Sequence, residues 1–179
     1  DLNDRRVDLL EEGYDLAIRI GNLPDSSLVA RRLARCRMLP CASPEYLARF
    51  GEPHTLEELS EHRCLRYRTT SGSEWQFGGH RLTVHGPLES NNGDVLTHAA
   101  EAGLGIAHQP SFLVTESIRQ GRLVPLLQNE EPVTLGIYGV YPARRHLPAK
   151  VERLLDFLAD AWGDPPKWER EMGLSPLAQ

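Results

Sequence analysis

The spacing of apolar residues predicts strands and helices that alternate along the chain. Residues 14–21, YDLAIRIG, alternate apolar side chains with polar or small ones, which is typical of a strand. Residues 148–162 carry apolar side chains at helical spacing and predict the longest helix, with one face formed by Val151, Leu154, Leu155, Leu158 and Trp162. Strands that alternate with helices in this way predict an α/β fold.

Cap and turn residues mark the ends of other elements. Ser43 and Pro44 predict a helix that ends at Gly51. Thr55 and Glu58 have the spacing of a capping box. The remaining expected elements are helices in residues 3–13, 92–103 and 110–120, a hairpin that turns at residues 78–79, and short strands at residues 64–68, 105–108 and 122–127.

The domain organisation is suggested by two unusually long extended stretches, residues 28–42 and 133–142. Such stretches predict two crossings between two lobes. The outer lobe is then expected in residues 1–34 and 138–162, and an inserted lobe in residues 35–137. Residues 163–179 hold two adjacent prolines and no periodicity, so they are predicted to be a loose C-terminal tail.

Composition excludes several classes of protein. Hydrophobic residues make up 40% and charged residues 25%, which is ordinary for a globular protein, and no apolar run approaches the roughly 20 residues of a membrane span. The net charge of −5 argues against a nucleic-acid interface on this segment. The first residues are charged, show no signal peptide and lack Met, so we expect an upstream part of the protein to be missing.

The cysteines are Cys36, Cys41 and Cys64, an odd number without a CxxC pair. They predict neither a disulfide framework nor a zinc site, and a reduced, cytoplasmic protein is the simplest interpretation. One alternative is that Cys36 and Cys41 form a redox pair. The other is that all three cysteines serve as small, buried hydrophobic residues.

No motif for catalysis or cofactor binding is present. The chain lacks GxSxG, HExxH and P-loop patterns, and its seven histidines have no metal-ligand spacing. The glycines of AGLGIA follow a helix and precede a strand, whereas a dinucleotide-binding loop needs the reverse order. We therefore expect no enzyme activity, no cofactor and no metal.

The segment SNNGDVLTHAAEAGLGIAHQP, residues 90–110, is the strongest candidate for ligand binding. Asn92 is expected to cap a helix whose free N–H groups can bind an anion, and Gly93 would let a ligand approach. Asn91 adds a second amide, and His108 and Gln109 stand at the end of the next strand, where ligands bind in open α/β sheets. The alternative is that Asn92 only caps its helix and His108 is an ordinary residue at a strand end.

Three residues at the ends of other strands are weaker candidates. Arg19 suits a carboxylate ligand, but an ion pair with an acid such as Asp15 is an equal alternative. Tyr67 and Arg68 end another strand and either face the same site or are simply exposed.

Most of the chain resembles one protein family. The segments RRVDLLEEGYDLAIRIGNLPDSSLVARRLARCRMLPCASPEYLARFGEP, SNNGDVLTHAAEAGLGIAHQPSFLV, GRLVPLL and YGVYPARRHLPAKVERLLDFL are similar to the effector-binding domain of LysR-type transcriptional regulators. The resemblance covers about residues 4–160 in order.

The resemblance implies a fold like that of periplasmic binding proteins, with two α/β lobes and an effector between them. It also implies a cytoplasmic regulator, dimeric or tetrameric, that binds promoter DNA through an absent N-terminal winged helix-turn-helix. The implied ligand-binding positions include Gly21 and Pro110 in addition to Arg19, Asn91, Asn92, His108 and Gln109. The polar pair at residues 108–109 departs from the aliphatic pair common in the family. Two alternatives share this fold, a solute-binding protein of a transporter and an enzyme.

Overall fold

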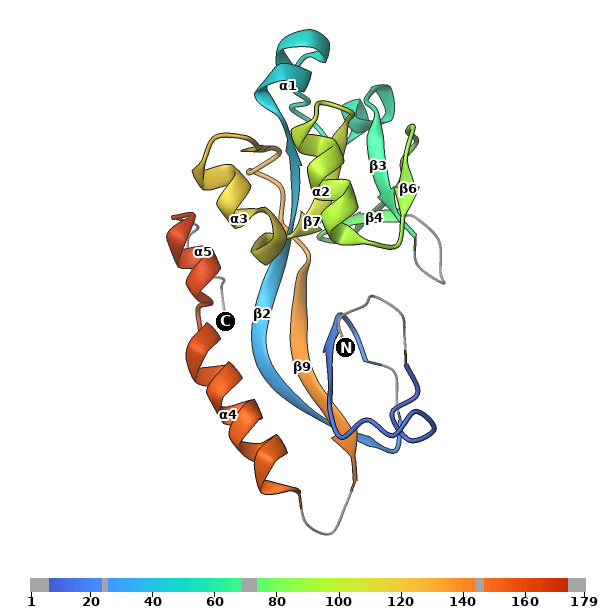
Figure 1. Ribbon diagram of the computed structural model, residues 1–179. Coiled ribbons are helices and arrows are strands. Elements are labelled where there is room, and N and C mark those ends of the chain that lie inside the picture. Colours follow the sequence, from blue (N-terminus) through green and yellow to red (C-terminus); the bar gives the residue numbers. More distant parts are fainter. Residues whose placement is uncertain (1–6, 24–25, 69–73, 144–146, 174–179) are drawn as a thin grey trace. The chain divides into compact units, whose positions relative to one another are not determined.

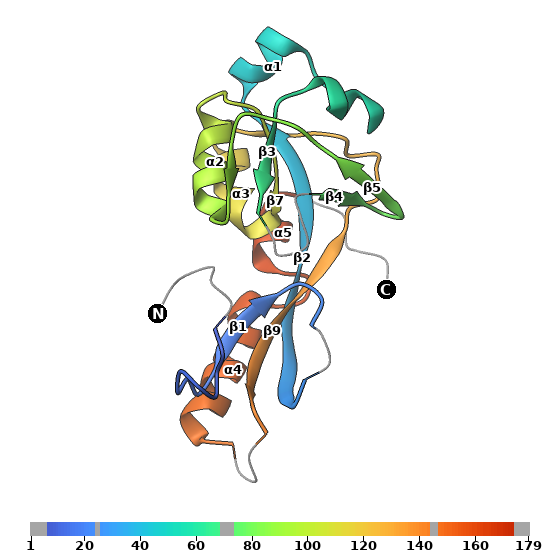
Figure 2. The same cartoon turned by 90° about the vertical axis from the view of Figure 1, so that its right-hand side faces the viewer.

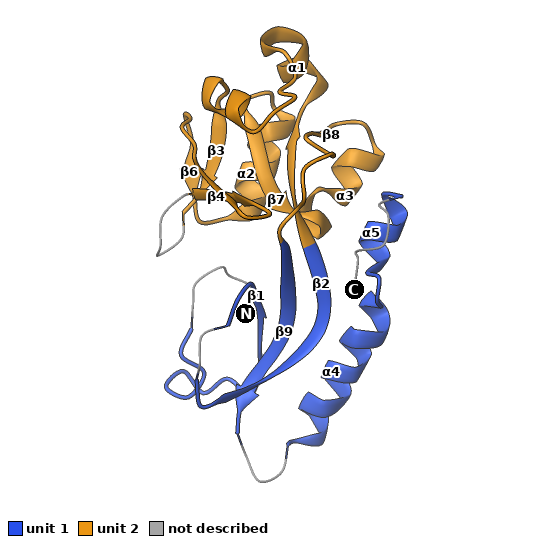
Figure 3. Cartoon of the chain, turned by 180° about the vertical axis from the view of Figure 1, so that it is seen from behind, with its two compact units in different colours: residues 1–36, 134–179 blue, residues 37–133 orange. Residues whose placement is uncertain are grey.

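The computed structural model describes residues 7–23, 26–68, 74–143 and 147–173. The chain forms two compact units, shown in different colours in Figure 3. Unit 1 consists of residues 1–36 and 134–179, and unit 2 is the continuous segment 37–133 between them. The sequence places the corresponding boundaries after residues 34 and 137.

Unit 1 is a small antiparallel sheet with a long helix. Its elements are β1 (Ala17–Ile20), the first part of β2 (Leu28–Ala42), β9 (Thr134–Pro142), α4 (Ala149–Trp162) and α5 (Lys167–Glu171). Strand β1 pairs antiparallel with β9, and β9 lies next to β2 in the strand order (Figure 1 and Figure 2). Both long extended stretches of the sequence are therefore single strands.

The core of unit 1 lies between α4 and this sheet. Leu33, Val151 and Leu155 are buried there, and Trp162 packs against them. Gly139 of β9 lies beneath the helix, because a Cβ added to it would come within 2.2 Å of Leu155 Cδ2. Close packing of α4 on the sheet thus depends on a residue without a side chain.

Unit 2 contains most of the secondary structure. Its elements are the second part of β2, α1 (Pro44–Phe50), the 3-10 helix η1 (Glu57–Glu61), β3 (Cys64–Tyr67), β4 (Glu74–Phe77), β5 (His80–Thr83), β6 (Glu89–Ser90), α2 (Gly93–Glu101), β7 (Ile106–Pro110), α3 (Ser111–Arg119) and β8 (Val124–Pro125). Strand β3 is parallel to both β6 and β7, whereas β2 is antiparallel to β7 and β8.

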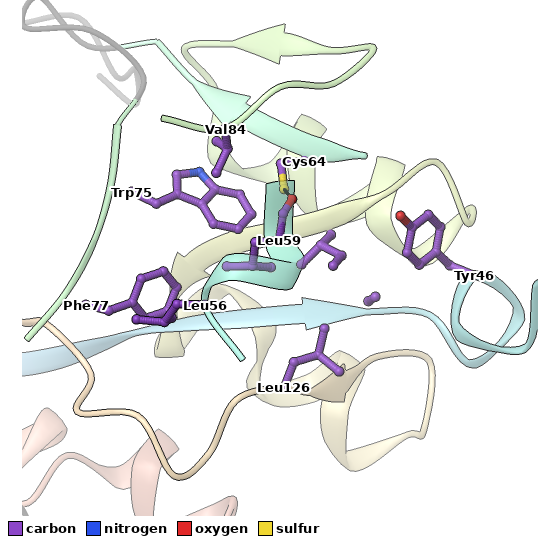
Figure 4. Packing of buried hydrophobic residues seen from close by; sticks show 10 residues of the cluster. Tyr46, Leu56, Leu59, Cys64, Trp75, Phe77, Val84 and Leu126 are labelled. Carbon is purple, nitrogen blue, oxygen red and sulfur yellow. Dashed lines mark hydrogen bonds between the residues drawn. The ribbon is translucent and has the colours of Figure 1, made fainter. Parts of the chain in front are cut away.

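The sheet of unit 2 is covered on both faces. One face packs against the hairpin of β4 and β5 and against η1, where Trp75, Phe77 and Leu59 join Cys64 in a buried cluster (Figure 4). Helices α2 and α3 pack against β7, and α2 also packs against β3. Burial on both faces fixes the direction in which each side chain of β3 and β7 points.

One predicted helix and one predicted capping box are not formed. Residues 7–13 form a turn, and the rest of the predicted helix lies outside the described residues. The Asp8 carboxylate accepts hydrogen bonds from the N–H groups of Leu10 and Glu11, which supplies a local alternative to helical bonding. The predicted capping box of Thr55 and Glu58 is not formed, because Glu58 accepts from the His54 N–H and the segment winds as a 3-10 helix.

The prediction of a loose end after residue 162 is wrong for residues 164–173. Trp168 of α5 packs edge-on against Trp162, with ring centroids 6.1 Å apart. Asp164 forms an ion pair with Arg35 of β2 at 2.9 Å. An aromatic contact and an ion pair, neither visible as periodicity, hold this segment on unit 1.

Candidate functional site

The carboxyl ends of three parallel strands meet at one edge of the unit 2 sheet. In the register of β3 and β6, Tyr67 lies beside Ser90. In the register of β3 and β7, Leu65 lies beside Ala107, and by the alternation of side chains Tyr67 and Gln109 point to the same face of the sheet as these two residues. This edge is the usual position of ligands in parallel α/β sheets.

Helix α2 begins at the same edge, directly after β6. Asn92 is its N-cap, and the Asn92 side-chain oxygen accepts from the Val95 N–H at 3.0 Å. The Ser90 hydroxyl accepts from the Asn92 N–H at 3.1 Å and so shapes the connection. The predicted cap is confirmed. Ser90 was not singled out as a site residue in the sequence, where its only signal is its position just before the two asparagines.

Replacing Asn92 by alanine is expected to lower the free energy of unfolding by about 1 kcal/mol, because α2 loses the acceptor at its N-terminus. The matched control is Asn91→Ala, since Asn91 is exposed and makes no cap bond. Urea denaturation of both variants measures the difference. Equal losses would show that the cap contributes nothing specific.

Neighbouring residues of β7 point to opposite faces of the sheet. Gln109 is 1% exposed, and its side-chain oxygen lies 3.1 Å from the position that a Cβ on Gly93 would occupy. His108 points to the other face, where its ring stacks on Phe77 at 4.7 Å between centroids. The structure therefore brings Gln109 to the start of α2 and does not bring His108 there.

His108 is part of the core under the hairpin. Its ring also lies 5.1 Å from Trp75, and its Nε2 is buried without a hydrogen-bond partner in the part of the chain that the structure describes. Burial lowers the pKa of His108 to about 4, against the opposing effect of a hydrogen bond with the Met38 backbone. The imidazole is accordingly neutral at physiological pH.

Gly93 has a packing role at this edge. A Cβ at residue 93 would lie 2.6 Å from Leu113 Cδ1. The absence of a side chain at residue 93 thus lets α3 approach the first turn of α2. The sequence analysis gave another reason for this glycine, namely the approach of a ligand. Pro110, the last residue of β7, precedes α3 without a side-chain cap.

Arg68 is occupied by an acid. The Glu89 carboxylate accepts from Arg68 Nε at 2.6 Å, and its other oxygen lies 3.0 Å from Arg66 Nη2. Because residues 66 and 68 alternate with Tyr67 along the strand, this cluster lies on the face opposite Gln109. Of the two residues predicted at the end of β3, Tyr67 therefore shares the face of Gln109 and Arg68 does not.

Arg19 and Gly21 belong to unit 1. Arg19 Nη2 donates to the Val7 carbonyl oxygen at 2.9 Å, and the alternative partner Asp15 is paired with Lys150 instead. Gly21 has φ of +115°, which favours glycine, and its N–H donates to the Gly136 carbonyl oxygen. Their part in ligand binding stays a prediction.

The cysteines are buried and unpaired, as one of the two alternatives predicted. Burial raises the pKa of all three thiols, Cys36, Cys41 and Cys64, to about 12, so none is a reactive thiolate at neutral pH. Within the described ranges, no three His, Cys, Asp or Glu side chains form a group suited to a metal ion. No helix in those ranges is both long and apolar enough to cross a bilayer.

Comparison with known families shows to which family the chain belongs. A family model described as the LysR substrate binding domain matches residues 1–163. The chain belongs to this LysR family. Its structure is also similar to that of CrgA, a LysR-type transcriptional regulator from Neisseria meningitidis, with a TM-score of 0.77 and 35% identity over 85% of this chain and 53% of CrgA.

Curated LysR relatives are named as transcriptional regulators. An uncharacterized HTH-type regulator of Haemophilus influenzae is 40% identical over 156 residues, which cover 84% of this chain and 54% of that protein. The regulator DmlR of Escherichia coli is 39% identical over 164 residues, 88% of this chain and 53% of DmlR. The chain thus spans about half the length of the curated relatives it matches.

Proposed function

We propose that this LysR substrate-binding domain senses a small, polar or carboxylated effector for a cytoplasmic transcriptional regulator. The family match over residues 1–163 is the observation that carries the proposal. The effector would favour one conformation of the regulator over another and so change its action at a promoter. The whole protein would bind DNA through an N-terminal winged helix-turn-helix outside this sequence and act as a homodimer or homotetramer.

The chemistry within unit 2 supports binding rather than catalysis. The aligned strand ends and the start of α2 bring together polar groups that can hold a ligand, notably Tyr67, Asn91, Asn92 and Gln109. His108, by contrast, is buried against aromatic rings, so we assign it an indirect role from the opposite face. No step in this proposal requires a cofactor, a metal ion or a covalent intermediate.

A ligand screen on the full-length regulator tests this function. Small carboxylates, aromatic acids, amino acids and sugars are added, and we expect one class to raise the melting temperature through preferential binding to the native state. A compound at about 100 times its Kd should add roughly 2.7 kcal/mol of stability. The same compound should change the affinity of the protein for its own promoter. Chemical conversion of a stabilising compound would contradict the proposal.

A further inference from the structure

The buried ring of His108 has one nitrogen with a hydrogen bond and one without. The ring is bonded to the Met38 backbone, whereas Nε2 is buried and has no partner within the described part of the chain. The bond to Met38 favours the charged ring, so the ring donates it, and the donor is Nδ1. Nε2 is therefore the nitrogen that would take up a second proton, and the N–H group formed there would be buried without an acceptor.

The rings around His108 come from the hairpin of β4 and β5. Trp75 and Phe77 project from β4 into the buried cluster (Figure 4), and the His108 ring stacks on Phe77 with an angle of 18° between the planes. A neutral imidazole is suited to this apolar contact. The aromatic faces attract a cation, but an imidazolium confined there would lose its water without gaining an acceptor. A charge on His108 therefore acts on the contact between the sheet and the hairpin.

The charged groups closest along the sheet do not supply a counter-ion. Arg66 and Arg68 point to the same face as His108, and Glu89 is paired with both of them, so this cluster has a net positive charge. Glu74 and Arg81 of the hairpin are exposed and form an ion pair with each other at 3.8 Å. A proton on His108 would thus add a further positive charge near two guanidinium groups.

The remaining charged and titratable groups lie on the opposite face or toward solvent. Arg37 of β2 alternates with Met38 and points to the other face of the sheet. The Glu58 carboxylate accepts from the His54 N–H. The others on elements packed against this face are exposed or half-exposed: His80, His85, Glu57, Glu61, Glu130 and Glu131. Burial is accordingly the largest effect on the His108 ring.

Backbone pairing holds β7 more firmly than it holds the hairpin. Strand β7 lies between β2 and β3 and pairs with both. Strands β4 and β5 pair with each other, and among the described residues the bridge from Phe77 to Pro132 is the backbone pairing that joins the hairpin to other segments. A two-stranded hairpin is marginally stable by itself. Packing on the sheet keeps it in place, so a charge on His108 would displace the hairpin before it displaced β7.

The bridge at Pro132 connects the hairpin to the segment that leads into β9. The Val133 carbonyl oxygen accepts from the Met38 N–H at 2.9 Å, and β9 begins at the next residue. Leu127, at the start of this segment, has a φ of +50°, a strained conformation for a residue with a side chain. Leu127 packs against the same buried cluster as the hairpin. Loss of that packing would let the strained backbone of residues 127–133 relax.

We infer that unit 2 contains an acid-sensitive switch, in which protonation of His108 at Nε2 releases the hairpin of β4 and β5 and loosens residues 127–133 before β9. At neutral pH the uncharged ring stays packed beneath the hairpin. In acid the ring takes a proton from solvent, and opening of the hairpin returns the charged ring to water. The switch needs no ligand, so it is independent of the proposed effector sensing and adds a response to acid.

Hydrogen–deuterium exchange of the full-length regulator at pH 7, 6 and 5 tests the switch, with rates corrected for the intrinsic effect of pH. His108 has a pKa of about 4 when packed and of about 6.5 when exposed, so the open fraction of the hairpin should rise about 20-fold from pH 7 to pH 5. Exchange at the Met38 N–H should rise with it. The Ile106 N–H, which donates to the Arg63 carbonyl oxygen, is the internal control and should remain much slower. Low urea should accelerate Ile106 more than the hairpin, because global unfolding exposes more surface.

Variants of His108 test the residue itself. His108→Leu and His108→Gln each lack the titrating ring, and in both we expect hairpin exchange to be independent of pH after the same correction. Two replacements of different polarity are used because one of them can pack poorly. His80→Gln is the matched control, since it removes an exposed histidine from the hairpin itself and should retain the response.

Each of three results would overturn the inference. The first is a hairpin whose corrected exchange does not change between pH 7 and pH 5, or changes equally in both His108 variants. The second is hairpin exchange that matches Ile106 in rate and urea dependence, because global unfolding would then explain it. The third is an open hairpin with a Met38 N–H that stays protected, since the segment before β9 would then be unaffected. A ligand screen without any hit would contradict effector sensing and leave the switch in place.

Discussion

Replacing His108 by leucine is expected to remove about 3 kcal/mol of pH dependence from the free energy of unfolding between pH 7 and pH 4. The folded protein keeps this imidazole neutral because the ring is buried against Trp75 and Phe77. The unfolded chain protonates the same residue near its ordinary pKa of about 6.5. Leucine is similar in size and has no proton to bind.

The sign follows from the two pKa values. Between pH 6.5 and about 4, the unfolded state binds a proton at His108 that the folded state does not, so acid favours unfolding. The contribution is fully present above pH 6.5 and is lost as the pH falls through this window. At pH 4 the leucine variant should therefore be the more stable protein, whereas at pH 7 the difference should be small.

Urea denaturation at pH 7, 6, 5 and 4 measures this difference directly. Exposed carboxylates titrate equally in both proteins and cancel when the two curves are subtracted. His80→Gln is the matched control, because His80 is exposed on β5 and its replacement should leave the curve unchanged. Parallel curves for the unmodified protein and His108→Leu would contradict the assigned burial of a neutral ring.

Replacing Gly105 by alanine is expected to cost about 3 kcal/mol or more of stability. A Cβ at this residue would lie 2.2 Å from the Arg63 carbonyl oxygen and 3.1 Å from the Arg63 carbonyl carbon. These are backbone atoms that precede β3, and the same oxygen accepts the hydrogen bond from the Ile106 N–H. The contact can be relieved only by moving β7 away from β3.

The displacement of β7 in Gly105→Ala should also disturb the candidate ligand-binding edge of unit 2, where β7 ends. Gly105 precedes β7, the strand that carries Gln109 and pairs with β3 at Ile106 and Ala107. Gly79→Ala is the control, because a Cβ at residue 79 meets no atom within 4 Å and Gly79 does not have a positive φ. Thermal unfolding of the two variants makes the comparison. A Gly105→Ala protein as stable as Gly79→Ala would show that the two strands do not approach so closely.

Strand positions could be predicted well from the sequence. Residues 28–42 are expected to be extended throughout, and β2 has these bounds. Alternation in residues 14–21 likewise identifies β1, yet Ile18 and Ile20 of that strand are more than 40% exposed. The periodicity of apolar residues predicts the type of secondary structure and which face is apolar, but it does not predict which element covers that face.

Elements that depend on competing local bonds could not be predicted in this way. In the turn at residues 7–13, the Asp8 carboxylate bonds backbone N–H groups that a predicted helix would have used. Before η1, the Glu58 carboxylate bonds the His54 N–H rather than the Thr55 N–H that a capping box would use. Helix α5 depends on the contact of Trp168 with Trp162. The partner of each of these side chains depends on distances in the folded structure, and the spacing of residues along the sequence does not reveal those distances.

The candidate site was predicted as a segment but not as an arrangement. Residues 90–110 do contain the capped helix and the strand with the polar pair. The separation of His108 from Gln109 follows from the alternation of side chains along a strand, which applies to any adjacent pair. Which of the two points toward α2 depends on the pairing of β7 with β3, and register is set by contacts across the sheet.

The division of unit 1 into two segments has a consequence for the order of folding during synthesis. Among the strands of the described residues, β1 pairs only with β9, and the pair of Ala17 with Val140 cannot form before Val140 has been synthesised. By then all of unit 2, residues 37–133, has been synthesised as one continuous segment. Chains are made from the N-terminus and compact segments generally fold as units. In every nascent chain, all residues of unit 2 are therefore synthesised before Ala17–Ile20 has its partner strand β9. Unit 2 can fold at this stage, whereas the sheet of unit 1 cannot yet form.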